Sequence, residues 1–141
     1  MWPEHILVRM EKFYPIAYAD GDSDYADSII KTFGELNSSD ALISFPTAKD
    51  LLDYLDALRP EDFPSLIIME YQLTLPDGNQ VLSFLKKIER YKDIPVLIYT
   101  QSAAAQIKKD VLASGAIFCI KKGESAQEIR EQVTFFMELI R

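Results

Sequence analysis

The sequence predicts an α/β fold: a three-layer α/β/α sandwich around a five-stranded parallel sheet with strand order 2-1-3-4-5. Two observations carry this prediction. Short apolar runs alternate with amphipathic stretches of helical period, and the connections between them are short. Such alternation predicts parallel strands joined by right-handed crossovers. The run at residues 65–69 is also apolar almost throughout, as expected for a strand that is covered on both faces.

The expected strands are short apolar runs bounded by turn-forming residues. In order, they occupy residues 15–19, 41–45, 65–69, 95–100 and 117–120. Pro64 opens the central strand, and a turn through Pro76, Asp77 and Gly78 follows it. Glu70 therefore stands at the carboxyl end of this strand, the edge at which open α/β sheets place their ligands.

The expected helices lie between the strands, where apolar residues recur at helical spacing. Their apolar positions are Tyr25, Ile29, Phe33 and Leu36; Leu51, Leu52, Leu55 and Leu58; Val81, Leu82, Leu85 and Ile88; Ile107, Val111 and Leu112; and Ile129, Val133, Phe136 and Ile140. Thr47 and Ser102 are expected to open helices, and Ser125 with Glu128 has the spacing of a capping box. Gly115 is expected to end the fourth helix as a left-handed cap.

The length of 141 residues suits one domain, with residues 1–14 as an N-terminal extension and residues 15–141 as the folded unit. No apolar run approaches the ~20 residues that cross a bilayer, and the N-terminus lacks the features of a signal peptide. We therefore expect a cytoplasmic protein with no membrane segment. Cys119 is the single cysteine, so we expect no internal disulfide and a small apolar core residue.

The net charge of −7 opposes binding to the phosphate backbone of nucleic acids, so proteins are the expected partners. The predicted topology brings four strand ends to one rim, which carry Asp20, Glu70, Thr100 and the pair Lys121 and Lys122. Carboxylates, a hydroxyl and an ammonium at one rim suit a metal-assisted phosphoryl site.

These residues, with the Asp77-Gly78 loop, occur in the order and on the strands found in one family. From Pro15 onward the chain resembles the CheY-like receiver domain of two-component response regulators, which has a flavodoxin-like fold. In that family the third strand ends in an Asp that accepts a phosphoryl group. The resemblance therefore places Glu70 at the acceptor position and implies a role in phosphorelay signalling.

The resemblance also implies a weakened metal site. The family's acidic pair corresponds to Asp20 and Gly21, so one Mg²⁺ ligand is missing. Asp22 could compensate only if the loop bends it inward, since adjacent side chains of an extended segment point to opposite sides. Gln72 stands where a backbone carbonyl usually completes the site. With Asp20 and Glu70 as the remaining ligands, Mg²⁺ binding is expected to be weak or lost.

The remaining family positions leave two alternatives open. Thr100 either serves as the family's switch residue, which contacts phosphoryl oxygens, or only bonds nearby backbone. Ungapped counting from Gly115 favours Lys122 as the pocket lysine, and a slip of one residue would select Lys121. Gly123 then replaces the proline that usually follows, and Cys119 stands where an aromatic switch residue is common.

Glu70 decides the expected mechanism. Its carboxylate reaches roughly 1–1.5 Å further than that of an Asp, and in-line attack depends on placement. We therefore expect a stand-alone pseudo-receiver without enzymatic activity, a monomer or weak dimer. It would bind a histidine kinase or a downstream signalling protein independently of phosphorylation. Glu70 either reaches toward Lys122 as a partial mimic of the activated state or leaves the site simply inactive.

Two other functions are alternatives for a chain with this predicted fold. The first is a phosphorylatable, Mg²⁺-dependent receiver that takes its phosphoryl group from a histidine kinase. The second is a flavodoxin-like cofactor binder. The acidic loop at residues 20–24 argues against the cofactor binder, because it would repel a phosphate.

Overall fold

The computed structural model describes residues 13–73, 76–102 and 104–141. Its sheet consists of β1 (Ile16–Ala19), β2 (Leu42–Phe45), β3 (Leu66–Met69), β4 (Val96–Thr100) and β5 (Phe118–Lys121). The strands are parallel and lie in the order β2-β1-β3-β4-β5. The predicted fold class and strand order are confirmed.

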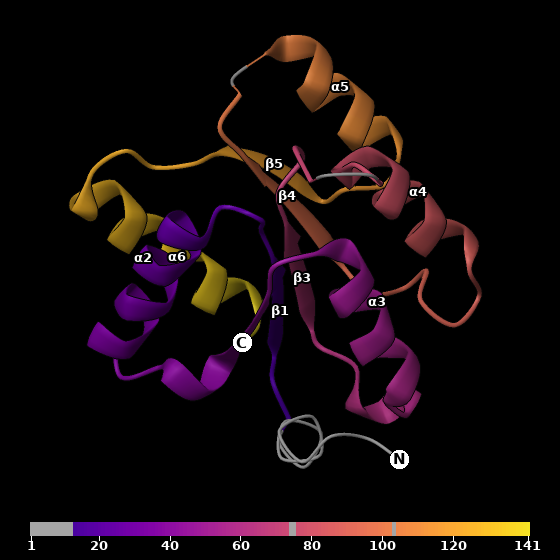
Figure 1. Ribbon diagram of the computed structural model, residues 1–141, viewed down its shortest axis with the longest axis horizontal. Helices are drawn as coiled ribbons and strands as arrows, with labels where there is room; N and C mark the ends of the chain where they lie inside the picture. Colours follow the sequence, from indigo (N-terminus) through magenta and orange to yellow (C-terminus); the bar gives the residue numbers. More distant parts are fainter. Residues whose placement is uncertain (1–12, 74–75, 103) are drawn as a thin grey trace.

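Helices cover both faces of this sheet (Figure 1). They are α2 (Ser23–Glu35), α3 (Ala48–Ala57), α4 (Gly78–Lys87), α5 (Ala105–Ala113) and α6 (Ala126–Leu139), with short 3₁₀ turns at Ser39–Ala41 and Pro60–Asp62. Helices α2 and α6 lie on one face, and α3, α4 and α5 lie on the other. Successive strand residues face opposite sides, so Tyr18 packs in the core under α2 and α6 while Ala17 and Ala19 pack in the other core.

Side-chain caps fix where most helices begin. The Asp22 carboxylate accepts a hydrogen bond from the Tyr25 N–H (3.1 Å), and the Thr47 hydroxyl accepts one from the Asp50 N–H (3.0 Å). The prediction that Ser102 opens a helix is wrong. Helix α5 begins at Ala105 with Ala104 at its N-cap, and the Ser102 hydroxyl accepts the Ala104 N–H (3.1 Å) ahead of the helix.

Strand β5 is one of the two edge strands of the sheet, and its residues are more exposed than those of the other strands. Phe118 and Lys121 are exposed. Cys119 is only half-buried, although it packs against the core as predicted, and burial raises the pKa of its thiol.

Of the predicted N-terminal extension at residues 1–14, positions 1–12 lie outside the described residues. Within the described ranges, no helix combines the length and apolar character that a bilayer span requires.

Gly78 sets the distance between α4 and the end of β3. A Cβ at this position would lie 2.6 Å from the carbonyl oxygen of Glu70 and 2.7 Å from the Cα of Tyr71. The Gly78 N–H donates to the Tyr71 carbonyl at 2.8 Å. Only a residue without a side chain permits this approach, so the loop after Glu70 depends on Gly78.

We expect Gly78→Ala to lower the free energy of unfolding by about 1–3 kcal/mol, because backbone atoms must move to admit the methyl group. Gly34→Ala is the matched control. A Cβ at Gly34 meets no atom within 4 Å, so this helical change should stabilise the protein by about 0.5–1 kcal/mol. Urea denaturation of both variants checks the prediction, and equal effects would contradict it.

Candidate functional site

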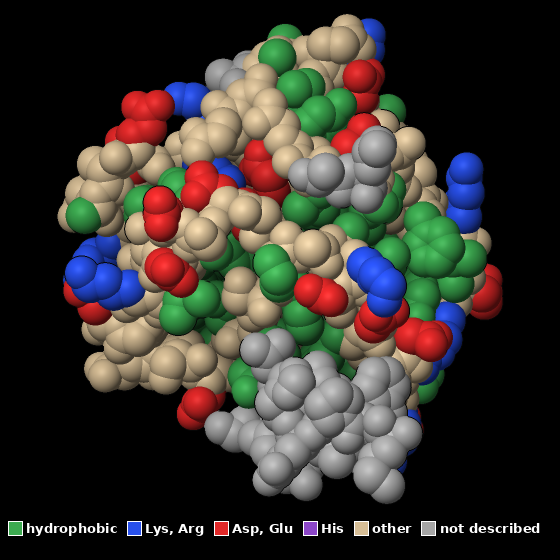
Figure 2. All heavy atoms as spheres, viewed as in Figure 1, with side chains coloured by type: hydrophobic (Ala, Val, Ile, Leu, Met, Phe, Trp, Pro, Cys, Tyr) green, Lys and Arg blue, Asp and Glu red, His purple; other side chains and the backbone are tan. Residues whose placement is uncertain are grey.

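Four polar side chains meet at the carboxyl end of the sheet. Asp20 follows β1, Glu70 follows β3, Thr100 ends β4 and Lys122 follows β5. Their exposed fractions are 2%, 4%, 0% and 3%, so all four are buried although they lie at the rim. Asp20, Glu70 and Lys122 border a pocket of about 350 Å³, which Asp22 also lines. Figure 2 shows Asp and Glu side chains gathered around the N-terminal end of α2, beside the end of β1.

Lys122 is the lysine of this pocket. Its Nζ lies 2.6 Å from Asp20 Oδ2 and 3.3 Å from Glu70 Oε2, and it stands 4.5 Å from the centroid of the Tyr25 ring. The Lys121 side chain is 47% exposed and pairs with Glu124 at 3.2 Å. Adjacent residues of the strand end point to opposite sides, so only one lysine can enter the pocket.

Asp20 is held by more than the lysine. Its Oδ1 accepts the Asp22 N–H at 2.9 Å, and its Oδ2 accepts the Tyr18 hydroxyl at 2.5 Å. Burial and the neighbouring Asp20 carboxylate raise the pKa of Tyr18 far above its ordinary value, so this hydroxyl stays a donor. Sequence reasoning missed Tyr18, although its position two residues before Asp20 on a strand places both side chains on one face.

Glu70 contacts three groups. Its Oε1 accepts the Gln72 N–H at 3.3 Å and the Thr100 hydroxyl at 3.4 Å. Its Oε2 lies 3.3 Å from Lys122 Nζ but makes no hydrogen bond within the described part of the chain. Burial raises the pKa of Glu70, and the nearby Lys122 offsets this only in part. A single ammonium thus serves two buried carboxylates, and the closer one is Asp20.

Thr100 bonds nearby backbone, as one of its two alternatives predicts, and its role as a switch residue stays a prediction. Its hydroxyl donates to Glu70 and also accepts the Ser102 N–H at 3.3 Å. Gln72, which was expected to act through its carbonyl, contacts the site through its N–H, and its side chain is exposed.

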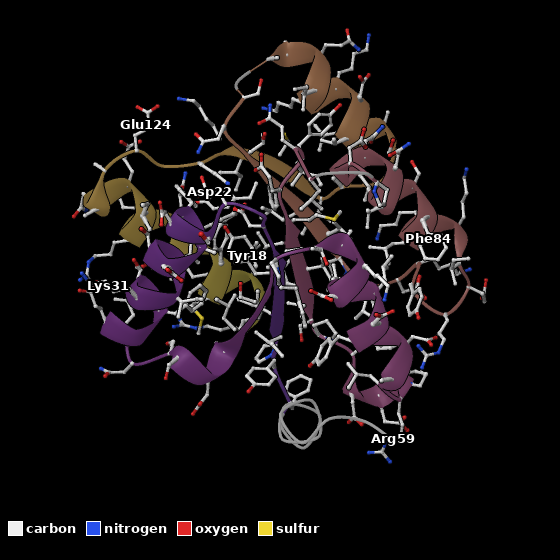
Figure 3. All side chains as sticks on the ribbon, viewed as in Figure 1. Tyr18, Asp22, Lys31, Arg59, Phe84 and Glu124 are labelled. Carbon is white, nitrogen blue, oxygen red and sulfur yellow. The ribbon has the colours of Figure 1, made fainter. Side chains whose placement is uncertain are left out.

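Asp22 does not bend inward to replace the missing acid. In Figure 3 it lies at the start of α2, where its exposed carboxylate caps the helix. Gly21 supplies no oxygen ligand from its side chain. The oxygens of Asp20 and Glu70 already face N–H groups, hydroxyls or Lys122. Among the residues that the structure describes, no three Asp, Glu, His or Cys side chains converge to hold a metal. This donor set therefore fits Mg²⁺ poorly.

The receiver class of proteins is defined by a doubly wound parallel sheet with particular side chains at its carboxyl edge. This protein has that sheet, and the side chains at its edge are Asp20, Glu70, Thr100 and Lys122. The family model for the response regulator receiver domain matches residues 18–134. The chain belongs to this family, whose members act in two-component signalling.

One curated relative is the probable methanogenesis regulatory protein FilR2 of Methanothrix harundinacea (strain 6Ac). It is 26% identical over 100 residues, which cover 70% of this chain and 64% of the relative. The chain thus matches somewhat less than two thirds of that protein's length.

Solved structures share the fold at low sequence identity. The phosphorylated cyanobacterial phytochrome response regulator RcpA is 16% identical, with a TM-score of 0.76 over 89% of this chain and 92% of that one. The Mn²⁺-bound form of response regulator Rcp1 is 18% identical, with a TM-score of 0.73 over 87% and 91%.

Proposed function

We propose that this receiver domain is a protein-interaction module of two-component signalling that works without phosphorylation and has no enzymatic activity. One observation carries the proposal: the carboxylate at the acceptor position is Glu70, and it already contacts both Thr100 and Lys122. These two side chains are the groups that would otherwise donate to the oxygens of a phosphoryl group. In this protein they have an internal partner.

Glu70 then acts as a partial substitute for the phosphorylated state. Its contacts draw the ends of β4 and β5 toward the end of β3, as a bound phosphoryl group would. Glu70 imitates the phosphoryl group only in part, because a carboxylate carries one negative charge, whereas a phosphoryl group carries approximately −2. The protein would therefore keep one conformation whether or not a phosphodonor is present.

Partners of this module would be a histidine kinase or a downstream signalling protein, and its place of action would be the cytoplasm. The net charge of −7 supports protein partners over nucleic acids. Mg²⁺ would bind weakly at most, because Gly21 replaces a ligand and Asp22 caps α2.

The proposal predicts that the protein gains no covalent phosphate when it is incubated with acetyl phosphate and Mg²⁺. Glu70 is longer than Asp by one methylene, its Oε1 accepts two hydrogen bonds and its Oε2 faces Lys122, so in-line attack lacks a suitably placed nucleophile. Intact-mass spectrometry provides the measurement. High-yield phosphorylation that peptide mapping assigns to Glu70 would overturn the proposal and favour the alternative of a phosphorylatable receiver.

A further inference from the structure

The backbone on both sides of Lys122 is held by one side chain from α6. The Gln132 side chain donates through Nε2 to the Lys121 carbonyl at 2.8 Å, and its Oε1 accepts the Gly123 N–H at 2.9 Å. The Lys121 carbonyl belongs to the peptide group before Lys122, and the Gly123 N–H belongs to the one after it. Because one contact needs a donor and the other an acceptor, the orientation of the amide is determined.

Gly123 makes this arrangement possible in two ways. It has an N–H to donate, which a proline at this position would lack. A Cβ here would lie 2.9 Å from the Cβ of Glu128 and 3.0 Å from Gln132 Oε1, so a larger residue would push α6 away. The buried glycine lets the start of α6 approach the lysine's backbone closely.

Two tyrosines connect the same amide to the ammonium of Lys122. The Tyr99 hydroxyl donates to Gln132 Oε1 and lies 2.9 Å from the Tyr25 hydroxyl, which also contacts the Gly123 carbonyl at 3.0 Å. The ring of Tyr25 stands 4.5 Å from Lys122 Nζ. Burial raises the pKa of both tyrosines, so both remain neutral hydroxyls. Side chains from α2, β4 and α6 thus form one hydrogen-bonded group beside Gly123, and the ring of Tyr25 extends from this group to the ammonium.

We propose that Gln132 is the positioning residue for Lys122, and that through it the placement of the ammonium between Asp20 and Glu70 depends on the position of α6. The backbone of Lys122 is also bonded to β4 by its N–H, which donates to the Thr100 carbonyl at 2.8 Å. That bond leaves the following peptide group free to rotate, and Gln132 removes this freedom. The inference concerns the unphosphorylated protein and holds whether or not Glu70 can accept phosphate.

The test uses Gln132→Met, which keeps the length of the side chain and removes its amide. Amide hydrogen exchange at Gly123 should become at least about tenfold faster, because its acceptor is lost, while exchange in α3 stays at the wild-type rate. The ¹⁵N-ammonium NMR signal of Lys122 should shift or broaden, while that of Lys121 does not. Neither measurement needs a phosphodonor or a partner protein, so a result that contradicts the role of Gln132 would leave the proposed function unchanged.

Two further variants sharpen the test. Gln127→Met is the matched control, since Gln127 is an exposed residue of the same helix that bonds Glu131 at 3.0 Å, and it should change neither signal. Gln132→Glu keeps an acceptor for Gly123 but cannot donate to the Lys121 carbonyl, so its effect should be intermediate. If Gln132→Met does not fold, Gln132→Glu alone tests whether Gln132 positions Lys122. A wild-type Lys122 signal in the Glu variant and the Met variant, or faster exchange of equal size throughout the protein, would overturn the proposal.

Discussion

Lys122→Met is expected to lower the free energy of unfolding by about 3–5 kcal/mol at neutral pH, the usual loss when one partner is removed from a buried ion pair. Lys122 is 3% exposed and lies within 3.3 Å of both Asp20 and Glu70, so its loss leaves two buried carboxylates without a cation. Urea denaturation measures the effect. Lys121→Met is the matched control, and its exposed pair with Glu124 should contribute less than about 1 kcal/mol.

A second substitution separates lost charge from lost packing. Glu70→Gln added to Lys122→Met removes one of the two uncompensated carboxylates and keeps its shape, so it should restore part of the stability. If the double variant is as unstable as Lys122→Met alone, the loss of stability comes from lost packing of the lysine side chain, and the ion-pair explanation is wrong.

The loss in Lys122→Met should also depend on pH. Burial raises the pKa of Glu70 even in the wild type, and removing Lys122 removes the strongest influence that lowers it. A carboxyl whose pKa is higher in the folded state favours folding when protonated, and this contribution is lost as the pH rises through the folded-state pKa. The stability difference from wild type should therefore narrow as the pH falls from 7 toward the ordinary glutamate value of about 4.3.

Glu70→Asp combined with Gly21→Asp is expected to turn the protein into one that accepts phosphate from acetyl phosphate in the presence of Mg²⁺. The shorter side chain frees the space between Thr100 and Lys122, and the new acid supplies the missing ligand. A Cβ at Gly21 meets only the Pro46 carbonyl oxygen, at 3.5 Å, so the loop can accept the change. Because a misplacement of about 1 Å can cost about a hundredfold in rate, phosphorylation should rise by roughly that factor or more.

Each single substitution serves as a control for the double variant. Glu70→Asp alone should label slowly, because Asp22 is engaged as the cap of α2, and Gly21→Asp alone should not label. Intact-mass spectrometry with and without Mg²⁺ compares the three variants. Full labelling of Glu70→Asp alone would mean that another group supplies the metal ligand, contrary to the geometry of the acidic loop.

The fold followed from the sequence because local signals agreed with one another. Apolar runs marked the five strands, helical spacing marked the five helices between and after them, and the alternation left one common topology. The same pattern placed Glu70 and Thr100 at the functional edge, since a residue that ends a parallel strand must lie there. The residue at which a helix begins was harder to predict. Ser102 has the hydroxyl of a capping residue, but this hydroxyl accepts the Ala104 N–H ahead of α5 and does not cap the helix.

Only the tertiary structure decided how the side chains at that edge pair. The choice between Lys121 and Lys122 depends on which face of β5 meets the rest of the rim, and a shift of one residue reverses it. The Asp22 carboxylate could bend toward Asp20 and Glu70 or cap α2, and the Tyr25 N–H, which has no partner within the helix, selects the cap. Three further features depend on contacts of β1 and α2 with β5 and α6: Asp20 lies closer to Lys122 than Glu70 does, the Tyr25 ring faces the ammonium, and Gln132 bonds the peptide groups on both sides of Lys122. β1 and α2 are distant in the chain from β5 and α6, so no local pattern records these contacts.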